Sequence, residues 1–496
     1  MKSLVRTALA TALLFSSAAT AAGQTRPLLK KVKKEELVSR LEREVPRLMA
    51  EADVPGLSIA LVRGGELAWH RGFGLRSAAL KEAVREDTIF EAASLSKPVF
   101  AYAVLKLVDA GKLDLDAPLT KYLPGNYDVG EDARLHQVTA RRVLSHTAGF
   151  PNWRPRGEKG LKIHFTPGDR FSYSGEGFVY LAAAVERLTG EPFEAFMRRT
   201  VFEPLGMTNS SYVWHEDYET RKIFRHNAVG KPVGQNRMPG PNAAASLHTT
   251  ARDFGLFLAA ALRGKGLKKE TARLFWTPQV RVGESTNTTA GPPRQLSAEV
   301  AWGIGWGLQT TGEGVAIWHW GDNGNTKAYV VGYPKEKLGV VFFTNSANGL
   351  SIARELVAES VGGAQPALAW IDYESYKSPA RTLLKNILAR GAGPALGEYR
   401  EWRKGRAPAE VLSEAQVNSL GYDLLSIERV ADAIEVFKLN VEDHPQSFNT
   451  YDSLGEAYMA GGDRERAITN YQKSVELNPD NTNGFEMLKK LQEKKP

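Results

Sequence analysis

Two groups of predicted strands lie far apart in this chain, and their separation constrains the fold more than any other feature. Residues 56–74, "GLSIALVRGGELAWHRGFG", predict two strands joined at Gly64-Gly65, a dipeptide typical of a hairpin turn. Apolar stretches between 302 and 345 predict several more strands. Residues 120–260, between the two groups, are rich in helix and turn signals. We therefore expect an α/β fold in which one sheet joins both groups around an inserted helical lobe.

Two helices are predicted next to these strands. Their apolar residues recur every three or four positions, which places them on one face of a helix. The positions are Leu37, Leu41, Val45 and Leu48 for the first helix, and Phe100, Val104, Leu107 and Val108 for the second. Each helix can therefore pack an apolar face against the predicted sheet.

The last part of the chain repeats itself at an offset of 34 residues, the period of a tetratricopeptide repeat. The matched pairs are Leu420 with Leu454, Gly421 with Gly455, Leu424 with Tyr458, Ala433 with Ala467, Phe437 with Tyr471, and Pro445 with Pro479. This segment resembles two tetratricopeptide repeats, with residues 485–491 as a capping helix; an ordinary helical hairpin is the alternative. The repeats either support the preceding domain or dock a partner protein, and the sequence does not decide between them.

The sequence predicts four parts. Residues 1–22 are expected to be a signal peptide, 35–365 an α/β domain, 366–410 a Gly-, Pro- and Arg-bearing linker, and 411–496 an all-α, tetratricopeptide-like domain. The prediction for the linker rests on its composition alone.

The first residues have the composition of a secretory signal peptide. Lys2 and Arg6 precede an apolar stretch from 8 to 15, and small residues follow it. An N-terminal anchor is the alternative. No stretch of 18 apolar residues occurs elsewhere, so no membrane span is expected. The chain has no cysteine, which excludes disulfides and thiolate metal sites. We expect a bacterial periplasmic or secreted protein after removal of the signal peptide.

The charge of the chain argues against nucleic acid as a partner. The formal net charge is +8, two charges of which lie in the predicted signal peptide, and the basic residues are dispersed. No cluster of His and carboxylate residues has the spacing of metal ligands, so no metal and no cofactor are expected.

Ser94 and Lys97 form the motif Ser-x-x-Lys at a predicted helix start. Residues three apart share a helix face, so the Lys97 amine can reach the Ser94 hydroxyl. Pro98 is tolerated only near a helix start, which puts Ser94 at or just before the first turn. A serine becomes nucleophilic when a base accepts its proton, and a lysine whose pKa is lowered can do so. On the tetrapeptide alone, a helix-capping serine with a solvated lysine is the more favoured interpretation.

Longer segments carry a family resemblance. They are "ASLSKPVFAYAVLKLVDAGKLDLDAPLTKYLP" (93–124), "VTARRVLSHTAGFPNW" (138–153), "TPGDRFSYSGEGFVYLAAAVERLTGEPF" (166–193) and "WHWGDNGNTKAYVVGYPKEKLGVVFFTN" (318–345). In this order they resemble the β-lactamase and penicillin-binding serine hydrolase superfamily, in the branch of class C β-lactamases, DD-peptidases and related esterases. The resemblance covers roughly residues 40–360. It implies a β-lactamase/transpeptidase-like α/β fold: an antiparallel sheet flanked by helices, with an inserted helical lobe.

The resemblance also implies roles for catalytic residues. Ser94 matches the nucleophile that forms an acyl-enzyme, and Lys97 matches its general base. Tyr173 matches the second-motif tyrosine, which moves protons between the nucleophile, the lysine and the leaving group. Since a tyrosine ordinarily titrates near 10, it needs neighbouring cations to act as a base at neutral pH. Without the resemblance, Tyr173 would be taken as a core residue.

Substrate-binding roles follow from the third motif, His319-Trp320-Gly321. His319 is expected to orient a substrate carboxylate or the tyrosine hydroxyl, and Gly321 and Asp322 to bind the substrate. The backbone N–H groups of Ser94 and Asp322 are the expected oxyanion donors. Trp320 is either a platform for an apolar acyl group or a packing residue. His146, in "LSHTAG", is expected to be a structural turn residue rather than a catalytic one.

Two departures from the family pattern bear on the substrate. The second motif is usually Tyr-x-Asn, but Gly175 stands in the third position, where it is a substrate-binding candidate without a side-chain amide. His319 also stands where many members have lysine. Because buried recognition groups discriminate strongly between substrates, both departures argue against lactam hydrolysis and acyl-D-Ala-D-Ala cleavage.

Three functions are therefore considered. The preferred one is an exported serine hydrolase that cleaves an ester or amide bond of a small-molecule or peptide substrate through an acyl-enzyme on Ser94. The alternative enzyme is a D-alanyl-D-alanine carboxypeptidase or class C-type β-lactamase. The third is a non-catalytic ligand-binding scaffold that uses the repeats for docking, which the intact Ser94, Lys97 and Tyr173 disfavour.

Overall fold

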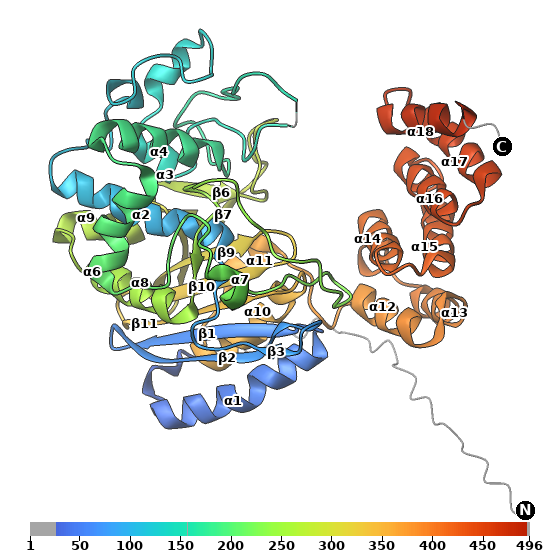
Figure 1. Cartoon of the computed structure of the whole chain (residues 1–496), viewed down its shortest axis with the longest axis horizontal. Helices are drawn as coiled ribbons and strands as arrows, with labels where there is room; N and C mark the ends of the chain where they lie inside the picture. The colour runs from blue at the N-terminus through green and yellow to red at the C-terminus, as the bar shows by residue number, and fades with distance from the viewer. Residues whose placement is uncertain (1–25, 156, 494–496) are drawn as a thin grey trace, which may run out of the picture. The chain divides into compact units, whose positions relative to one another are not determined.

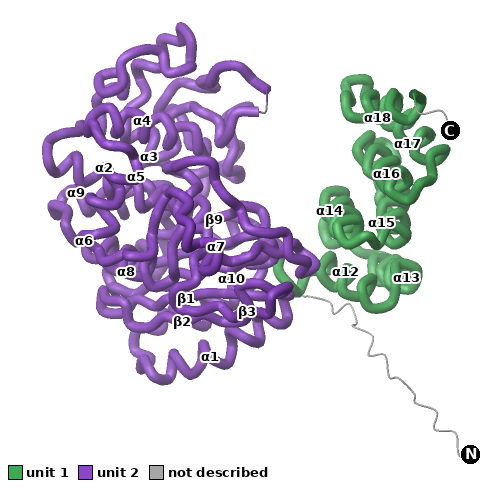
Figure 2. Tube along the Cα trace, in the orientation of Figure 1, with its two compact units in different colours: residues 1–23, 375–496 green, residues 24–374 purple. Residues whose placement is uncertain are grey.

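The structure is a computed structural model that describes residues 26–155 and 157–493. The described residues form two compact units that divide after Glu374 (Figure 2). Unit 2 contains the sheet and the helices around it, and unit 1 contains the C-terminal helices. The predicted signal peptide, 1–22, lies outside the described residues.

Unit 2 is built on a nine-stranded sheet in which every paired strand is antiparallel, in the order β3-β2-β1-β11-β10-β9-β8-β7-β6 (Figure 1). The strands are β1 Gly56–Arg63, β2 Glu66–Ser77, β3 Glu82–Ala83, β6 Val280–Gly283, β7 Leu296–Trp302, β8 Gly307–Thr311, β9 Gly314–Asp322, β10 Lys327–Tyr333 and β11 Leu338–Thr344. β1 pairs with β11, so the two predicted strand groups meet in one sheet. The predicted fold class and the hairpin at 56–74 are confirmed.

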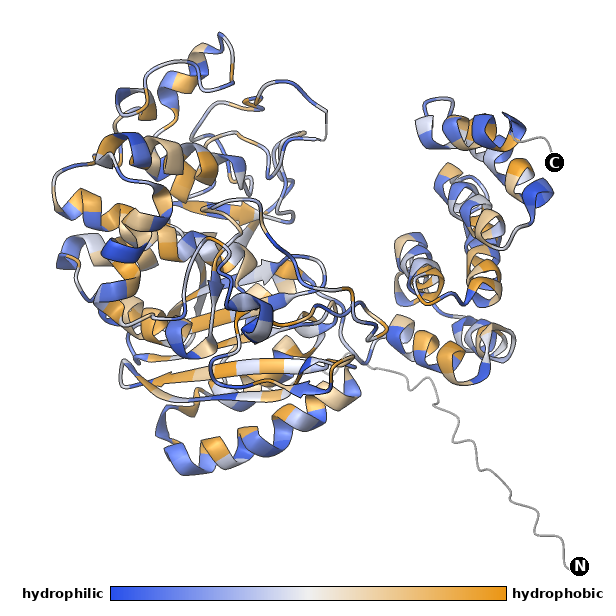
Figure 3. Cartoon of the chain, in the orientation of Figure 1, coloured by the Kyte–Doolittle hydropathy of each residue, from blue (hydrophilic) through white to orange (hydrophobic). Residues whose placement is uncertain are grey.

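Helices cover the central strands on both faces. All residues of β10 and β11 are buried, which requires cover on both sides because neighbouring side chains point to opposite faces. Helix α8 (Ala251–Arg263) packs on β1, β2 and β11, while α1 (Lys34–Glu51) packs on β2 and on α10 (Ala353–Ser360). Figure 3 shows hydrophobic residues along the strands and a largely hydrophilic outer surface on α1. The predicted apolar face of α1 is buried through Leu37, Leu41, Val45 and Leu48.

The inserted lobe lies between β3 and β6 in sequence. It contains α2 Ser96–Asp109, α3 Ala140–Leu144, α4 Glu176–Thr189, α5 Phe193–Met197, α6 Glu203–Leu205, α7 Tyr218–Arg221 and α9 Lys269–Arg273, together with α8 and the short pair β4 Phe90–Glu91 and β5 His248–Thr249. A 3₁₀ turn, Ala93–Leu95, joins β4 to α2 and lies against β9 and β10. The Ser94 turn therefore lies between the sheet and the helical lobe.

The described part of unit 1 contains helices and no strand, as the all-α prediction requires. Its helices are α12 Pro379–Arg390, α13 Ala392–Arg403, α14 Glu414–Leu425, α15 Val430–Asp443, α16 Phe448–Ala460, α17 Arg464–Leu477 and α18 Thr482–Glu493. The pair α14–α15 recurs as α16–α17 with both starts displaced by the 34-residue period. In each pair a glycine faces an aromatic ring: a Cβ on Gly421 would lie 2.3 Å from Phe437, and one on Gly455 would lie 3.2 Å from Tyr471.

The segment predicted as a linker, 366–410, is mostly helical, so its composition was misleading. It contains α11 (Pro366–Ile371), α12 and α13. Pro366 and Pro379 begin helices, where a missing N–H costs nothing, and Gly391 separates α12 from α13 at φ 85°. Gly and Pro thus mark helix ends here. Among the described residues, no helix combines the length and the apolar composition needed to cross a membrane.

Candidate active site

Ser94 lies in a strained turn at the start of α2. Ala93, immediately before it, has φ 48°, a left-handed value that is uncommon for a residue with a side chain. Ser94 is partly exposed, whereas its neighbours Ala93 and Leu95 are buried. Pro98 lies in the first turn of α2. The turn therefore presents the Ser94 side chain from an otherwise buried segment, at the predicted position just before the helix.

Gly321 allows β9 to approach this turn closely. A Cβ at Gly321 would lie 2.5 Å from the carbonyl oxygen of Ala92 and 3.3 Å from the Cβ of Ala93. Any side chain there would push β9 away from the residues that precede Ser94. The structure thus gives Gly321 a steric role beside the nucleophile, in addition to the substrate contact that the sequence predicts.

Lys97 is fully buried and points at Ser94. Its Nζ lies 3.1 Å from Ser94 Oγ and 3.0 Å from the carbonyl oxygen of Ala244. The amine also lies 4.7 Å from the centre of the Tyr173 ring. Burial lowers the pKa of Lys97 to about 7, because removal from water disfavours the charged form. A large share of Lys97 is therefore neutral at pH 7 and able to accept a proton.

Tyr173 lies in the loop before α4, with its ring against the Lys97 amine. Among the described residues its Oη has no hydrogen-bond partner of good geometry, although it lies near enough to Ser94 for that hydroxyl to affect its pKa. Burial raises the pKa of Tyr173 well above its usual value, and the Ser94 hydroxyl lowers it only in part. Tyr173 is therefore a neutral hydroxyl in this state, and Lys97 is the stronger candidate base.

His146 fixes the loop that carries Tyr173. Its Nδ1 accepts a hydrogen bond from the backbone N–H of Ser174 at 2.9 Å, and its carbonyl oxygen accepts one from Ser172 N at 2.8 Å. The imidazole also stacks on the Tyr173 ring, with centroids 4.2 Å apart. Burial and the nearby Lys97 lower the pKa of His146, so it is neutral. His146 therefore contacts the Tyr173 loop and ring directly, a contact that the motif "LSHTAG" did not reveal.

His319 is buried on β9, and its geometry assigns its proton. Nδ1 lies 2.7 Å from the carbonyl oxygen of Trp320, so Nδ1 must be the donor and Nε2 carries the lone pair. Among the described residues, Nε2 has no hydrogen-bond partner. Burial, together with Lys97, lowers the pKa of His319 to about 3. His319 is thus a neutral acceptor, with its ring centroid 6.1 Å from that of Tyr173.

Trp153 occupies the space beside Gly175. A Cβ built on Gly175 would lie 2.6–2.8 Å from three atoms of the Trp153 indole, which is 44% exposed. The Trp153 loop is fixed to the second motif, because the backbone N–H of Gly175 donates to the carbonyl and the side-chain oxygens of Asn152. Arg154 and Glu176 add an ion pair of 3.2 Å. An indole therefore stands where the family's asparagine side chain would extend.

Asp322, at the end of β9, is held through its carboxylate. Lys327 Nζ lies 2.5 Å from Oδ1, and the backbone N–H of Gly324 donates to the same oxygen at 2.7 Å. Tyr373 Oη donates to Oδ2 at 2.5 Å. The sequence singled out Asp322 but not Tyr373, which lies beyond the last motif and has no sequence signal of its own.

A second buried polar cluster contains Glu91, which lies three residues before Ser94. Lys222 forms an ion pair with Glu91 at 3.1 Å, and its Nζ also lies 3.1 Å from His248 Nε2. Glu91 Oε2 accepts hydrogen bonds from Asn236 and Asn323. No motif pointed to this cluster, since its members are dispersed in sequence.

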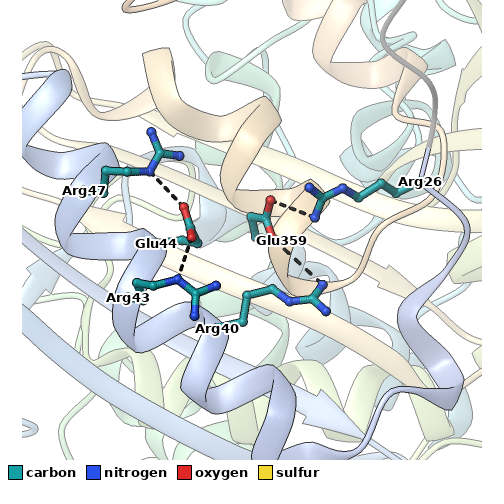
Figure 4. Close-up of a pocket in the computed structure, with 6 residues that line it drawn as sticks. All are labelled: Arg26, Arg40, Arg43, Glu44, Arg47 and Glu359. Atoms are coloured by element: carbon teal, nitrogen blue, oxygen red, sulfur yellow. Dashed lines mark hydrogen bonds and ion pairs between the residues drawn. The ribbon is translucent and has the colours of Figure 1, made fainter.

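The structure also contains a surface hollow of about 690 Å³ near α1 and α10 (Figure 4). It is lined by Arg26, Arg40, Arg43, Glu44, Arg47 and Glu359, and contains none of the predicted site residues. Each glutamate in the hollow lies between two arginines, Glu44 between Arg43 and Arg47 and Glu359 between Arg26 and Arg40, so arginines outnumber carboxylates. Within residues 26–155 and 157–493, no group of three or more His, Asp or Glu residues is placed to hold a metal ion.

Comparisons with known proteins address the family and the fold of the chain. The family model described as "Beta-lactamase" matches residues 41–360. Esterase EstB of Burkholderia gladioli is 28% identical over 309 residues, which cover 55% of this chain and 78% of the esterase. An octameric penicillin-binding protein homologue from Pyrococcus abyssi superposes with a TM-score of 0.55 at 24% identity, covering 70% of this chain and 81% of its own.

A third comparison is with D-alanine carboxypeptidase AmpC from Burkholderia cenocepacia, which has a TM-score of 0.54 at 19% identity and covers 66% of this chain and 99% of its own. At such identities the two solved structures show the fold alone. The family model matches well over half of the chain and includes every residue predicted for the site. This chain therefore belongs to the beta-lactamase family and is a serine hydrolase.

Proposed function

We propose that this protein hydrolyses an ester or small amide that carries no carboxylate beside the scissile bond, through an acyl-enzyme on Ser94. The observation that carries the proposal is the contact of 3.1 Å between Nζ of the buried Lys97 and Oγ of the partly exposed Ser94. Among the described residues, no carboxylate forms an ion pair with Lys97, and burial lowers its pKa to about 7. A neutral amine beside a serine hydroxyl is the pairing that nucleophilic catalysis requires.

The reaction proceeds in two halves. Lys97 Nζ accepts the proton of Ser94 Oγ as Oγ forms a bond to the acyl carbon, and the resulting oxyanion is bound by the backbone N–H groups of Ser94 and Asp322. The bond to the leaving alkoxide or amine then breaks, and that group takes a proton from Lys97 directly or through Tyr173 Oη. Water next attacks the acyl carbon, gives a proton to Lys97, and releases the acid as Ser94 Oγ is protonated again.

Tyr173 acts in this scheme as a neutral proton relay. Its raised pKa keeps the proton on Oη, so it can donate one proton while it accepts another. His146 stacks on the Tyr173 ring, and the His319 ring lies with its centroid 6.1 Å from that of Tyr173, so the phenol has a buried, uncharged setting. In this scheme Tyr173 relays protons and Lys97 is the general base.

The proposed substrate class rests on the two departures from the family pattern, His319 and Gly175. His319 is neutral, so it offers no positive charge to a substrate carboxylate of the kind that D-alanyl-D-alanine peptides and lactams carry. Trp153 fills the space next to Gly175, and the amide contact of the family's asparagine is missing. An apolar or uncharged acyl group suits these surroundings better. The relative EstB is named an esterase, which is consistent with an ester substrate.

Export and partner binding are further parts of the proposal. The basic and apolar order of residues 1–22 supports export as a periplasmic or secreted protein. The 34-residue recurrence of α14–α15 as α16–α17 supports an assignment of tetratricopeptide repeats, which can dock a protein partner.

Labelling and turnover together test the proposed reaction. A fluorophosphonate probe should modify Ser94 in the wild type and leave Ser94→Ala unmodified. Turnover of p-nitrophenyl acyl esters should exceed that of a chromogenic cephalosporin and of an acyl-D-Ala-D-Ala peptide by at least about a hundredfold in kcat/KM, the discrimination that loss of polar recognition contacts can give. Faster turnover of the cephalosporin or the peptide would refute the substrate class. An unlabelled Ser94 would refute the acyl-enzyme.

A further inference from the structure

A segment outside the family-matched range lies beside the active site. The match ends at residue 360, yet α11 (Pro366–Ile371) packs on β7 and β8 within unit 2. Trp370 Nε1 donates to the carbonyl oxygen of Gly283 at 2.6 Å. The Trp370 ring lies 6.2 Å from that of Trp320, which in turn lies 4.9 Å from Tyr173. Residues after the family domain therefore contact the residues next to the catalytic tyrosine.

Tyr373 extends this contact to the end of β9. Its Oη donates to Asp322 Oδ2, while Lys327 binds Oδ1 and its amine lies 5.4 Å from the Tyr373 ring. Burial and the Asp322 carboxylate raise the pKa of Tyr373 above its usual value, so the phenol keeps its proton and remains a donor. The Asp322 carboxylate is thus held by the Lys327 cation and the Gly324 N–H at Oδ1, and by the Tyr373 hydroxyl at Oδ2.

The same turn is held from the Ser94 side as well. Asn323 Nδ2 donates to Glu91 Oε2 at 3.1 Å, and Glu91 lies three residues before Ser94. The backbone of Asp322 is therefore fixed between Glu91, through the next residue, and Tyr373, through its own side chain. Only the Tyr373 contact comes from outside the family-matched residues.

We propose that Tyr373 is a positioning residue of this active site, which holds the Asp322 carboxylate so that the Asp322 backbone N–H points at the reacting carbonyl oxygen. Residues 366–374 then complete the hydrolase site, although they follow the family domain in sequence. The proposal rests on the proposed function, since it assigns Asp322 N–H to the oxyanion. Tyr373 touches no reacting atom and acts through Asp322 alone.

Tyr373→Phe in the full chain is the direct test, because it removes only the hydroxyl. We expect the rate of Ser94 modification by the fluorophosphonate and kcat for a p-nitrophenyl ester to fall about tenfold, a part of the 10²–10³ that loss of a whole oxyanion donor costs. KM should change less than about twofold, because ground-state binding does not use the oxyanion donor. Tyr122→Phe, which removes a hydroxyl that accepts a hydrogen bond from Asp114 N, is the matched control and should leave both rates unchanged.

A double-mutant cycle separates positioning from a general structural effect. If Tyr373 acts through the Asp322 carboxylate, Tyr373→Phe should add less than about twofold to the loss caused by Asp322→Ala, since coupled residues are not additive. Hydrogen exchange of the peptide spanning 320–327 should accelerate in Tyr373→Phe and in Asp322→Ala, but not in Tyr122→Phe.

The outcomes distinguish this proposal from the proposed function. A Tyr373→Phe rate within twofold of the wild type, or an undiminished tenfold effect in the Asp322→Ala background, would overturn the role of Tyr373 while leaving the acyl-enzyme in place. If wild-type Ser94 is not modified at all, the proposed function fails. Hydrogen exchange of 320–327 then still decides whether Tyr373 holds the turn, and unchanged exchange would overturn that as well.

Discussion

Unit 2 buries two lysines beside the same turn, and their surroundings differ in one respect. Lys97 and Lys222 are both fully buried, and each amine lies against an aromatic ring, that of Tyr173 and Trp214 respectively. Lys222 has a carboxylate partner, Glu91, at 3.1 Å. Lys97 has hydroxyl and carbonyl oxygens instead, those of Ser94 and Ala244.

This difference separates the lysine that we propose as the base from the lysine that we propose as structural. Burial lowers the pKa of both amines, but for Lys222 the charge of Glu91 opposes the shift. A paired ion that keeps its charge suits the support of a turn, whereas an unpaired amine titrating near 7 suits proton transfer. Among the described residues Lys97 has no carboxylate partner, and this feature supports its proposed role as the base.

The largest expected effect comes from Lys97→Met, which removes the base but keeps an apolar side chain of similar length. We expect kcat/KM for an acyl ester to fall by about 10³, within the range for loss of a general base. Lys106→Met, on the same helix α2, is the control and should retain activity. A Lys97→Met enzyme that keeps more than a tenth of wild-type activity would contradict the assignment.

Lys222→Met should act on stability more than on chemistry. Because it leaves Glu91 buried without its cation, we expect a loss of about 3–5 kcal/mol in the free energy of unfolding, measured by urea denaturation. The folded fraction should keep Ser94 reactivity within about tenfold of the wild type. Adding Glu91→Gln should recover part of the lost stability. If folded Lys222→Met loses Ser94 reactivity as completely as Lys97→Met does, the distinction between the two lysines is wrong.

The smallest effect, counted per pH unit, is a pH dependence of stability that the comparison of the wild type with Lys97→Met isolates. Its pKa is about 7 in the folded chain, against 10.5 for an ordinary lysine, so the unfolded chain binds more protons between these values. The free energy of unfolding of the wild type, relative to Lys97→Met, should therefore rise with pH from about 7 to about 10, by up to about 1.4 kcal/mol per pH unit. Urea titrations of both proteins at pH 6, 8 and 9.5 measure this, and a pH-independent difference would show that Lys97 keeps an ordinary pKa.

The sequence predicts the proposed nucleophile and base better than it predicts the residues around them. Ser94 and Lys97 are three residues apart, so helix geometry allows the serine and the lysine to meet, as they do, although the tetrapeptide alone favours a solvated lysine. The sheet and its hairpin were also predictable, since strand patterns are local. The family resemblance was needed to bring in Tyr173, which lies far along the chain.

What remained hidden depends on contacts between distant segments. Trp153 belongs to one of the family-like segments, but nothing in the sequence indicates that its ring covers Gly175. Tyr373 meets Asp322 across fifty-one residues and outside every motif. The left-handed backbone of Ala93 has no sequence signal, because alanine normally avoids it. The helices of 366–403 were missed because Gly and Pro at helix ends have the composition of a linker.

The pH dependence of Ser94 modification tests the central claim most directly. The second-order rate of fluorophosphonate labelling in the wild type should rise with pH to half its maximum near pH 7 and then level off, as Lys97 loses its proton. In Lys97→Met the labelling rate should be much lower, and it should show no titration near pH 7. A wild-type rate that keeps climbing to pH 10, or a titration near 7 that survives in Lys97→Met, would contradict the assignment of Lys97 as a base that is neutral at physiological pH.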